Sequence, residues 1–365
     1  MPLNPSRLVL ARARREMTQS KLAAQAGVTP RAIKAYEADE MSPSDSTLDA
    51  LARVLDFPVT FLTATDNVEL LNVDTVSFRS LKSLTARRRN AGLAAAALAI
   101  ELDRWIDDEY SLRRHDIPND LADTDPELAA DSLRRAWGLG NAAIPNMVHL
   151  LEVHGIRVFS LVEDCRELDA FSTWRDNTPY VFLNTMKSAE HSRMDAAHEL
   201  GHLVLHREGA PNGKQAEAEA NAFAAAFLMP RSSVLAAGIR HPNLTSLIVK
   251  KRLWGVSVAA LVVRLHRLGL ISDWTYRSLF MELSKAGYRS KEPGGLAPES
   301  SAVLAQVLGL LREDGRGVKD VARAIAVPVE ELERLMFGLA MVGVSGSRSG
   351  SKPTRGHLRL VAPSD

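Results

Sequence analysis

The sequence predicts an α+β fold that is predominantly helical, and three patterns lead to that expectation. Apolar residues recur at helical spacing through the first 66 residues. Three short runs rich in aromatic and β-branched residues lie within residues 156–184 and predict a small sheet. Helical spacing then returns in residues 188–206 and 214–229 and continues through most of the later chain.

A chain of 365 residues is too long for one compact core, so we expect several domains. The predicted segments are residues 1–66, 67–115, 116–260, 261–342 and 343–365. The first is a five-helix domain, and the second is a helical connector with a long helix. The third holds the small sheet, and the fourth is helical. The fifth is rich in Gly, Ser and Arg and is expected to be disordered.

The composition excludes several classes of protein. Hydrophobic residues make up 46% and charged residues 24%, as in ordinary soluble proteins. We find no apolar run of the roughly 20 residues that a membrane span needs, and the N-terminus lacks the apolar core of a signal peptide. Cys165 is the single cysteine, so an intrachain disulfide is impossible. We therefore expect a cytoplasmic protein that does not contact membranes.

Residues 18–37 have the marks of a helix-turn-helix. Thr18 can cap the first helix, and Gly27 permits the left-handed turn that follows it. Thr29 can cap the second helix, which Pro30 begins. The alternative is a small helical bundle used for protein contacts.

Charge in this region favours the DNA-binding interpretation. The first 36 residues hold seven basic side chains against Glu16 alone, which predicts a local basic face. We expect the second helix to direct its polar side chains at bases and phosphates, while the first helix starts near the DNA backbone. The candidate DNA-binding residues are Gln19, Thr29, Arg31 and Lys34.

Residues 5–65 resemble the XRE, or phage-repressor-like, family. The resemblance implies double-stranded DNA as a partner, and a homodimer on two half-sites is a reasonable expectation. One feature departs from the family pattern, because Ala38-Asp39-Glu40 replaces the usual glycine after Tyr36-Glu37. These acids disfavour strong DNA contact by that loop.

A second motif, His198-Glu199-Leu200-Gly201-His202, lies within a predicted helix. Zinc hydrolases need three protein ligands, an open position for water, and a base. Histidines four residues apart share one helix face and lie roughly 6 Å apart along its axis, so His198 and His202 can converge on one ion. Glu199 can then reach a water on that metal and act as the general base.

The third ligand must come from another element, and the next predicted helix offers Glu217 and Glu219. We favour Glu217, and Glu219, roughly 160° away around the helix, is the reserve. Asn221 shares a face with Glu217 and could hydrogen-bond a ligating histidine. His206 lies roughly 12 Å from His198 along the axis, too far to share the ion, and is expected in an outer layer or at the surface.

Residues 120–290 resemble the ImmA/IrrE family of metallopeptidases. The resemblance is carried by residues 180–184, 196–206, 217–230 and 254–257. It implies a minimal gluzincin-like fold, a Zn²⁺ cofactor, and regulatory cleavage of a transcription factor. It also assigns the two histidine ligands to His198 and His202, the base to Glu199 and the third ligand to Glu217.

The resemblance implies a single protein partner as substrate, a repressor or another transcription regulator. A substrate segment could add as an extended strand along an edge formed by Tyr180, Phe182 and Asn184. The leading hypothesis is therefore a transcriptional regulator combined with a zinc endopeptidase. The alternative is a transcription factor whose peptidase-like domain is a sensor or oligomerisation module without turnover. A role as a partner in a toxin–antitoxin or prophage switch overlaps with both.

Overall fold

A computed structural model describes residues 2–71, 85–161, 170–207, 213–289 and 292–340. The chain forms two compact units that interleave along the sequence. The first unit comprises residues 1–113, 159–168 and 302–365, and the second comprises residues 114–158 and 169–301. The five segments drawn from the sequence stay a prediction about domain boundaries.

The first unit begins with the five-helix domain that the sequence predicts. Its helices are α1 (Pro5–Arg14), α2 (Gln19–Ala26), α3 (Pro30–Glu37), α4 (Asp45–Leu55) and α5 (Val59–Leu62). Thr18 and Thr29 cap α2 and α3, and Gly27 between them adopts a φ of 70°. Leu22 and Ile33 are fully buried where these two helices pack together.

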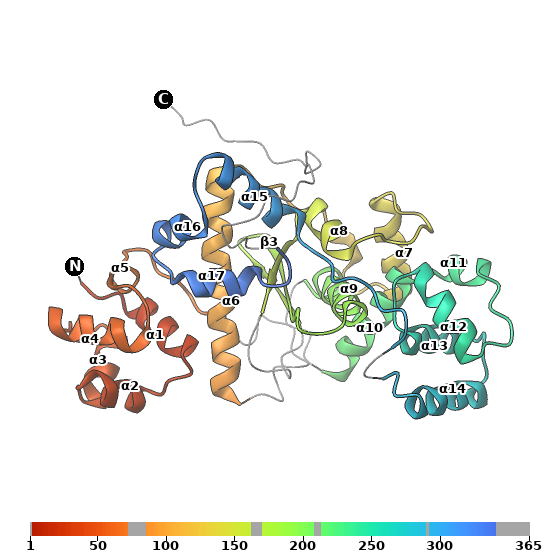
Figure 1. Ribbon diagram of the computed structural model, residues 1–365, viewed down its shortest axis with the longest axis horizontal. Coiled ribbons are helices and arrows are strands. Elements are labelled where there is room, and N and C mark those ends of the chain that lie inside the picture. Colours follow the sequence, from red (N-terminus) through yellow and green to blue (C-terminus); the bar gives the residue numbers. More distant parts are fainter. Residues whose placement is uncertain (1, 72–84, 162–169, 208–212, 290–291, 341–365) are drawn as a thin grey trace. The chain divides into compact units, whose positions relative to one another are not determined.

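The same unit contains the long helix α6 (Ala86–Tyr110), whose Ala-rich middle is buried. The C-terminal helices are α15 (Ala302–Glu313), α16 (Val318–Ala324) and α17 (Val329–Met336). Figure 1 shows α17 lying across α6, and α1 packs against α6 as well. The long helix thus supports both the first and the last described helices of the chain.

A buried ionic clasp joins α17 to α1. Glu331 is 2% exposed, and one of its oxygens lies 2.6 Å from Nε of Arg14, which is 4% exposed. Arg15 donates a second hydrogen bond to the same carboxylate. Burial alone would raise the pKa of Glu331, but the charges of the two arginines outweigh it and hold this pKa below its ordinary value.

A small sheet has the strand order β1-β3-β2, and its strands β2 and β3 belong to the second unit. The strands are β1 (Arg157–Ser160), β2 (Phe171–Arg175) and β3 (Thr178–Leu183). β2 and β3 form an antiparallel hairpin with Phe171 opposite Phe182. The turn between them uses Asp176 and Asn177, both at positive φ, which these residue types tolerate best after glycine.

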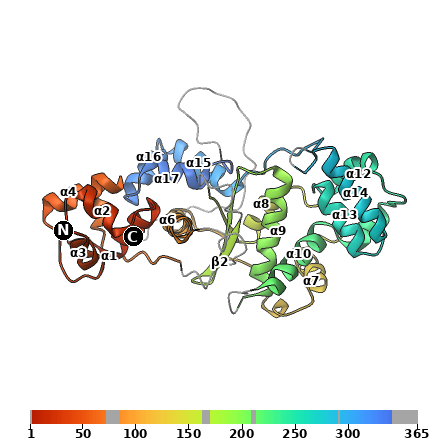
Figure 2. The ribbon, with the colours of Figure 1, turned by 90° about the horizontal axis from the view of Figure 1, so that it is seen from below.

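The described residues of the second unit also form eight α-helices and two 3₁₀ turns. They are α7 (Pro126–Ala136), α8 (Met147–Val153), α9 (Ala189–Leu205), α10 (Lys214–Leu228), α11 (Arg231–Ala236), α12 (Leu244–Lys250), α13 (Val258–Arg267) and α14 (Asp273–Lys285), with 3₁₀ turns η2 (Asn119–Leu121) and η3 (Lys251–Leu253). α9 packs on β2 and β3, and Figure 2 shows α10 beside it. Within the described ranges, no helix has the length and apolarity to cross a membrane.

The predicted fold class is confirmed, since the described chain is mostly helical with one small sheet. The long helix predicted for the connector is observed as α6. The expected disorder of residues 343–365 concerns residues outside the described ranges, and so does Cys165.

The clasp gives a prediction about stability. Replacing Glu331→Gln leaves two arginines without their buried counter-charge, so we expect the free energy of unfolding of the first unit to fall by about 3–5 kcal/mol. Hydrogen exchange of amides in α1 and α17 at increasing urea would measure the loss. Glu333→Gln, at an exposed position of α17, is the control and should leave exchange unchanged.

The pH dependence of this contribution has a defined sign. Because the folded-state pKa of Glu331 is depressed, the stabilisation is fully present above the unfolded-state pKa of about 4.3. It is lost as the pH falls through the lower folded-state pKa. Equal acid sensitivity of the unaltered protein and Glu331→Gln would contradict this interpretation.

Candidate metal centre

The candidate centre forms where α9 and α10 approach closely. Ser188 caps the N-terminus of α9, and the helix then runs unbroken through the whole motif. Gly201 makes the close approach possible, because a Cβ atom at this position would lie 3.1 Å from Phe223 Cδ1 and 3.2 Å from Ala220 Cα. The glycine of the motif is therefore a packing requirement between the helices that carry the candidate ligands.

Three candidate ligand residues surround one point between these helices. The Nε2 atoms of His198 and His202 are 3.0 Å apart. Glu217 Oε2 lies 3.5 Å from His198 Nε2, and Glu217 Oε1 lies 3.6 Å from His202 Nε2. Ligands about 2.0–2.1 Å from a tetrahedral ion are roughly 3.3 Å from one another. The first distance lies below that value and the other two lie above it, and these two reach different oxygens of Glu217. With one ligand atom from each residue, all separations are within 4.8 Å, which allows the three residues to hold a single ion.

Glu199 directly follows His198 on α9 and is held by the sheet. Its side chain is buried, and Oε2 accepts a 2.7 Å hydrogen bond from Ser172 Oγ on β2. The same hydroxyl lies 3.3 Å from the Glu199 carbonyl oxygen. Ser172 therefore fixes the orientation of the candidate base. Sequence reasoning missed this residue, because only the folding of β2 onto α9 brings the two together.

The outer residues differ in part from expectation. Asn221 was expected to hydrogen-bond a ligating histidine, but its Nδ2 donates to the carbonyl of Glu217 at 2.6 Å. Glu219, the reserve ligand, lies 2.9 Å from Nε2 of His206 instead. His206 in turn contacts His202 through their Nδ1 atoms, 3.2 Å apart. Burial lowers the pKa of His206, although its hydrogen bond to Glu219 works in the opposite direction.

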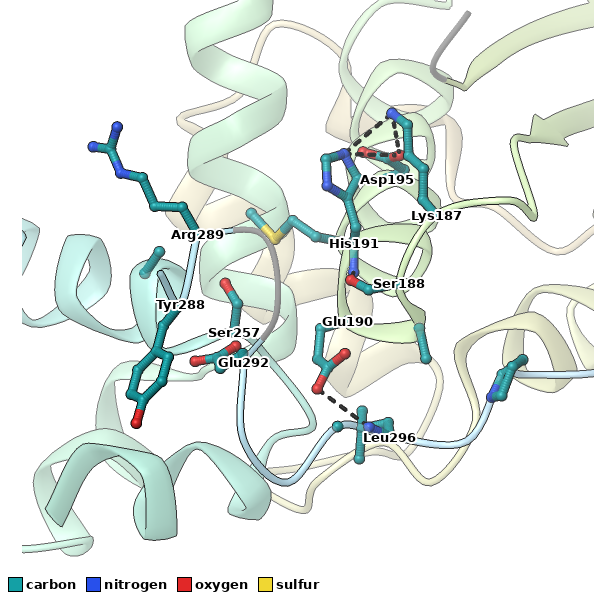
Figure 3. A pocket seen from close by; sticks show the side chains of 15 residues that line it. Lys187, Ser188, Glu190, His191, Asp195, Ser257, Tyr288, Arg289, Glu292 and Leu296 are labelled. Atoms are coloured by element: carbon teal, nitrogen blue, oxygen red, sulfur yellow. Dashed lines mark hydrogen bonds and ion pairs between the residues drawn. The ribbon is translucent and has the colours of Figure 1, made fainter. Parts of the chain in front are cut away.

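A pocket of about 540 Å³ lies along the first turns of α9 (Figure 3). His191 and Asp195 line it, and helical periodicity puts both near the face that carries His198. Lys187 Nζ lies 3.2 Å from His191 Nε2 and 3.6 Å from Asp195 Oδ2. Burial raises the pKa of the Asp195 carboxyl to about 6, with Lys187 acting against that rise.

Two carboxylates that line this pocket, those of Glu190 and Glu292, belong to a buried ion cluster. Lys251, 1% exposed, lies 2.9 Å from Glu190 Oε1 and 3.4 Å from Glu292 Oε2. These contacts tie the start of α9 to η3 and to the segment that follows α14. The N-terminal end of the motif helix is thus fixed by charge, whereas its middle is fixed by close packing.

Of the four candidate DNA-binding residues in the first unit, two are exposed and two have side chains that make hydrogen bonds within the domain. Arg31 and Lys34 are exposed on α3, as a reading helix requires. The Thr29 hydroxyl caps α3 by accepting from the amide of Ala32. The Gln19 amide donates to Glu37 Oε2 at 2.7 Å, so its Nε2 is engaged within the domain.

The expected basic face is smaller than the sequence indicated. Arg14 and Arg15 are taken up by the clasp described above. Arg12 pairs with Glu37 at 2.5 Å, and Arg7 pairs with Asp66 and with Glu101 on α6. The count of positive residues was correct, but four of the seven bind carboxylates of the same unit. The exposed cations are Lys21, Arg31 and Lys34.

The expected substrate edge is wrong. Tyr180 and Phe182 lie on β3, which is the middle strand of the sheet, and Asn184 follows its end. All three side chains are buried. A strand with neighbours on both sides cannot accept a further strand. Of the described strands, β2 is the edge that contacts α9 and the candidate base.

Two histidines and a carboxylate around one point, with a glutamate next to one of the histidines in the sequence, are the set of residues typical of a mononuclear metallohydrolase site. This site occurs in a chain that also has a helix-turn-helix domain. Comparison with protein families agrees on both parts. Residues 9–62 match the helix-turn-helix family, and residues 151–266 match the IrrE N-terminal-like domain.

Residues 9–62 are therefore similar to XRE-type helix-turn-helix domains, and residues 151–266 are similar to ImmA/IrrE-type metallopeptidase domains. Both resemblances expected from the sequence are confirmed. The comparison with curated proteins found no match.

The close packing at Gly201 gives a prediction. In Gly201→Ala the new methyl group meets Phe223 and the backbone of α10, so we expect the second unit to lose about 1–3 kcal/mol of unfolding free energy. Gly309→Ala in α15 is the matched control, because nothing lies within 4 Å of a Cβ there. It should gain about 0.4–1 kcal/mol instead. Urea unfolding of both variants tests this, and equal signs would contradict it.

Proposed function

We propose that this chain is a DNA-binding transcriptional regulator that also cleaves a specific regulatory protein by zinc-dependent hydrolysis. One observation carries the enzymatic half: the ligand atoms of His198, His202 and Glu217 lie within 4.8 Å of one another. Two imidazoles and one carboxylate leave a fourth position open, as in catalytic zinc sites. Such an ion lowers the pKa of a water molecule and polarises a peptide carbonyl.

The chain's own residues supply the proton transfers. Glu199 takes a proton from the attacking water and later delivers it to the leaving amine. Ser172 Oγ donates to Glu199 Oε2 at 2.7 Å and so holds the carboxylate in one orientation for this transfer. Since both side chains are buried, the carboxylate acts in a setting of reduced solvent screening, where a fixed orientation has the most effect.

The substrate would bind as an extended segment along β2. This strand lies at the margin of the described sheet, and its Ser172 contacts the candidate base. A segment paired with β2 would receive main-chain hydrogen bonds and bring its carbonyl to the metal site. The pocket along His191 and Asp195 would then receive a neighbouring substrate side chain. A single regulatory protein, such as a repressor, fits a site with these restraints.

The DNA-binding half rests on the exposed face of α3. Arg31 and Lys34 would meet base edges and phosphates of double-stranded DNA, and a dimer would read two half-sites. Because Arg7, Arg12, Arg14 and Arg15 are paired internally, few phosphate contacts are expected. The affinity should therefore depend less steeply on salt than the charge of the first 36 residues implies.

The alternative is a transcription factor whose metallopeptidase domain senses a signal without turnover. The covalent connection of the two domains in one chain favours it. A reporter assay with the unaltered protein and Glu199→Gln separates the two functions. Regulation that survives the substitution supports the sensor, and regulation that is lost supports proteolysis.

Glu199→Gln tests the catalytic proposal directly. It keeps the size of the side chain and removes the base, so we expect cleavage of the partner repressor to fall by at least about 100-fold while zinc content is unchanged. Cleavage would be followed by mass spectrometry of candidate regulators incubated with zinc-loaded protein. The exposed Glu333→Gln is the control. Equal cleavage by the unaltered protein and Glu199→Gln would refute the peptidase proposal.

Arg31→Ala and Lys34→Ala test the DNA proposal. Binding to operator fragments selected by DNA pull-down should weaken for both, by about 1–3 kcal/mol where the side chain contacts a base edge. The change would be measured by fluorescence anisotropy at two salt concentrations. Arg53→Ala, an exposed arginine on α4, should bind as the unaltered protein does. The proposal fails if all three variants bind alike.

A further inference from the structure

A relay of three hydrogen-bonded side chains, those of His202, His206 and Glu219, leads away from the candidate metal centre. It starts at Nδ1 of His202, passes 3.2 Å to Nδ1 of His206, and then 2.9 Å from Nε2 of His206 to Oε2 of Glu219. The His202 and His206 side chains are only 3% and 9% exposed, whereas Glu219 is 33% exposed. The relay therefore runs from the buried centre to the surface, across the contact of α9 and α10.

If a metal bound Nε2 of His202, and both imidazoles were neutral, the relay could hold its hydrogens in only one arrangement. A ligating Nε2 atom on His202 requires the hydrogen of that ring to be on Nδ1. Nδ1 of His206 must then be the acceptor, so His206 carries its own hydrogen on Nε2. That Nε2–H donates to Glu219, whose carboxylate can only accept. Every donor in the series faces an acceptor, and the series ends on a negative charge.

We propose that His206 and Glu219 are positioning residues that hold His202 in the tautomer and ring orientation needed to bind the metal. The inference rests on the proposed function, because it takes His202 to be a ligand. It assigns a role to two residues that lie outside the ligand set. Hydrogen bonds from outer residues commonly orient ligating histidines and raise their basicity. Here the carboxylate would act through an intervening histidine.

The location of the two residues supports this assignment. His206 follows the last residue of α9, one helical turn after His202, and its amide closes the helix on the His202 carbonyl. Glu219 comes from α10, the helix that also supplies Glu217. The relay thus connects the same two helices as the metal site, but on the side away from Glu217. It fixes the ring of His202 from behind while the ligand atoms face the centre.

A purely structural role for the pair makes a different prediction. If His206 and Glu219 only join α9 to α10, their loss should lower the stability of the metal-free protein and leave the intrinsic zinc affinity unchanged. The exposed contact from Gln215 Nε2 to Glu219 Oε1, 2.9 Å long, provides a matched control. Gln215→Ala removes a hydrogen bond to the same carboxylate without touching the relay.

The test measures zinc affinity by competition with a chromophoric chelator, and the visible spectrum of the Co²⁺-substituted protein as a second readout of ligand geometry. We expect His206→Leu to weaken zinc binding by about 10–100-fold and to change the Co²⁺ spectrum. His206→Asn, whose side-chain oxygen can accept from His202 Nδ1, should retain more affinity than His206→Leu. Glu219→Gln should cause a smaller loss than His206→Leu, and Gln215→Ala should cause none.

The double variant His206→Leu/Glu219→Gln should bind zinc no more weakly than His206→Leu alone, because the two residues act in series. Melting temperatures of the metal-free variants separate affinity from folding, and Glu219→Gln decides the matter if His206→Leu does not fold. Zinc affinity equal to that of the unaltered chain in both single variants would overturn the relay. If the unaltered chain itself failed to bind zinc, the proposed function would fall first.

Discussion

The approach of α9 to α10 at Gly201 is the constraint on which the second unit depends. A side chain at this position would meet Phe223 and Ala220, so the helices could not come as near to each other. This approach brings Glu217 to within 3.6 Å of two imidazole nitrogens. The remaining parts follow from it: β2 packs on the same helix and delivers Ser172, and the end of α9 delivers His206 to α10.

Local patterns were enough to predict most helices and the three residues that come together at the candidate metal centre. The spacing of His198 and His202 determines a shared face as soon as the helix forms, and Glu217 follows from the next helical segment. The caps Thr18 and Thr29 were equally visible, because a helix N-terminus is read from a few adjacent residues. The ligand assignment itself stays a prediction until metal binding is measured.

Features that depend on distant pairing could not be read from the sequence. The order of the three strands is set by contacts between segments, so β3 was taken for an edge although it lies in the middle. The basic face was overestimated for the same reason. Arg14 and Arg15 find their counter-charge 317 and 316 residues away, on a helix whose sequence gives no sign of that pairing. For the same reason, the sequence did not predict the contact of Ser172 with Glu199 or that of Glu219 with His206.

The clasp between α1 and α17 has a consequence for biosynthesis. A ribosome delivers the helix-turn-helix domain first and Glu331 among the last described residues, with the entire second unit in between. Arg14 and Arg15 therefore stay hydrated, without their ion pairs to Glu331, until the second unit has been synthesised. Domains generally fold as units during synthesis, so the second unit would fold before Glu331 pairs with Arg14 and Arg15. Premature termination after residue 301 would give a chain that contains all residues of the candidate metal centre but lacks Glu331, the partner of Arg14 and Arg15.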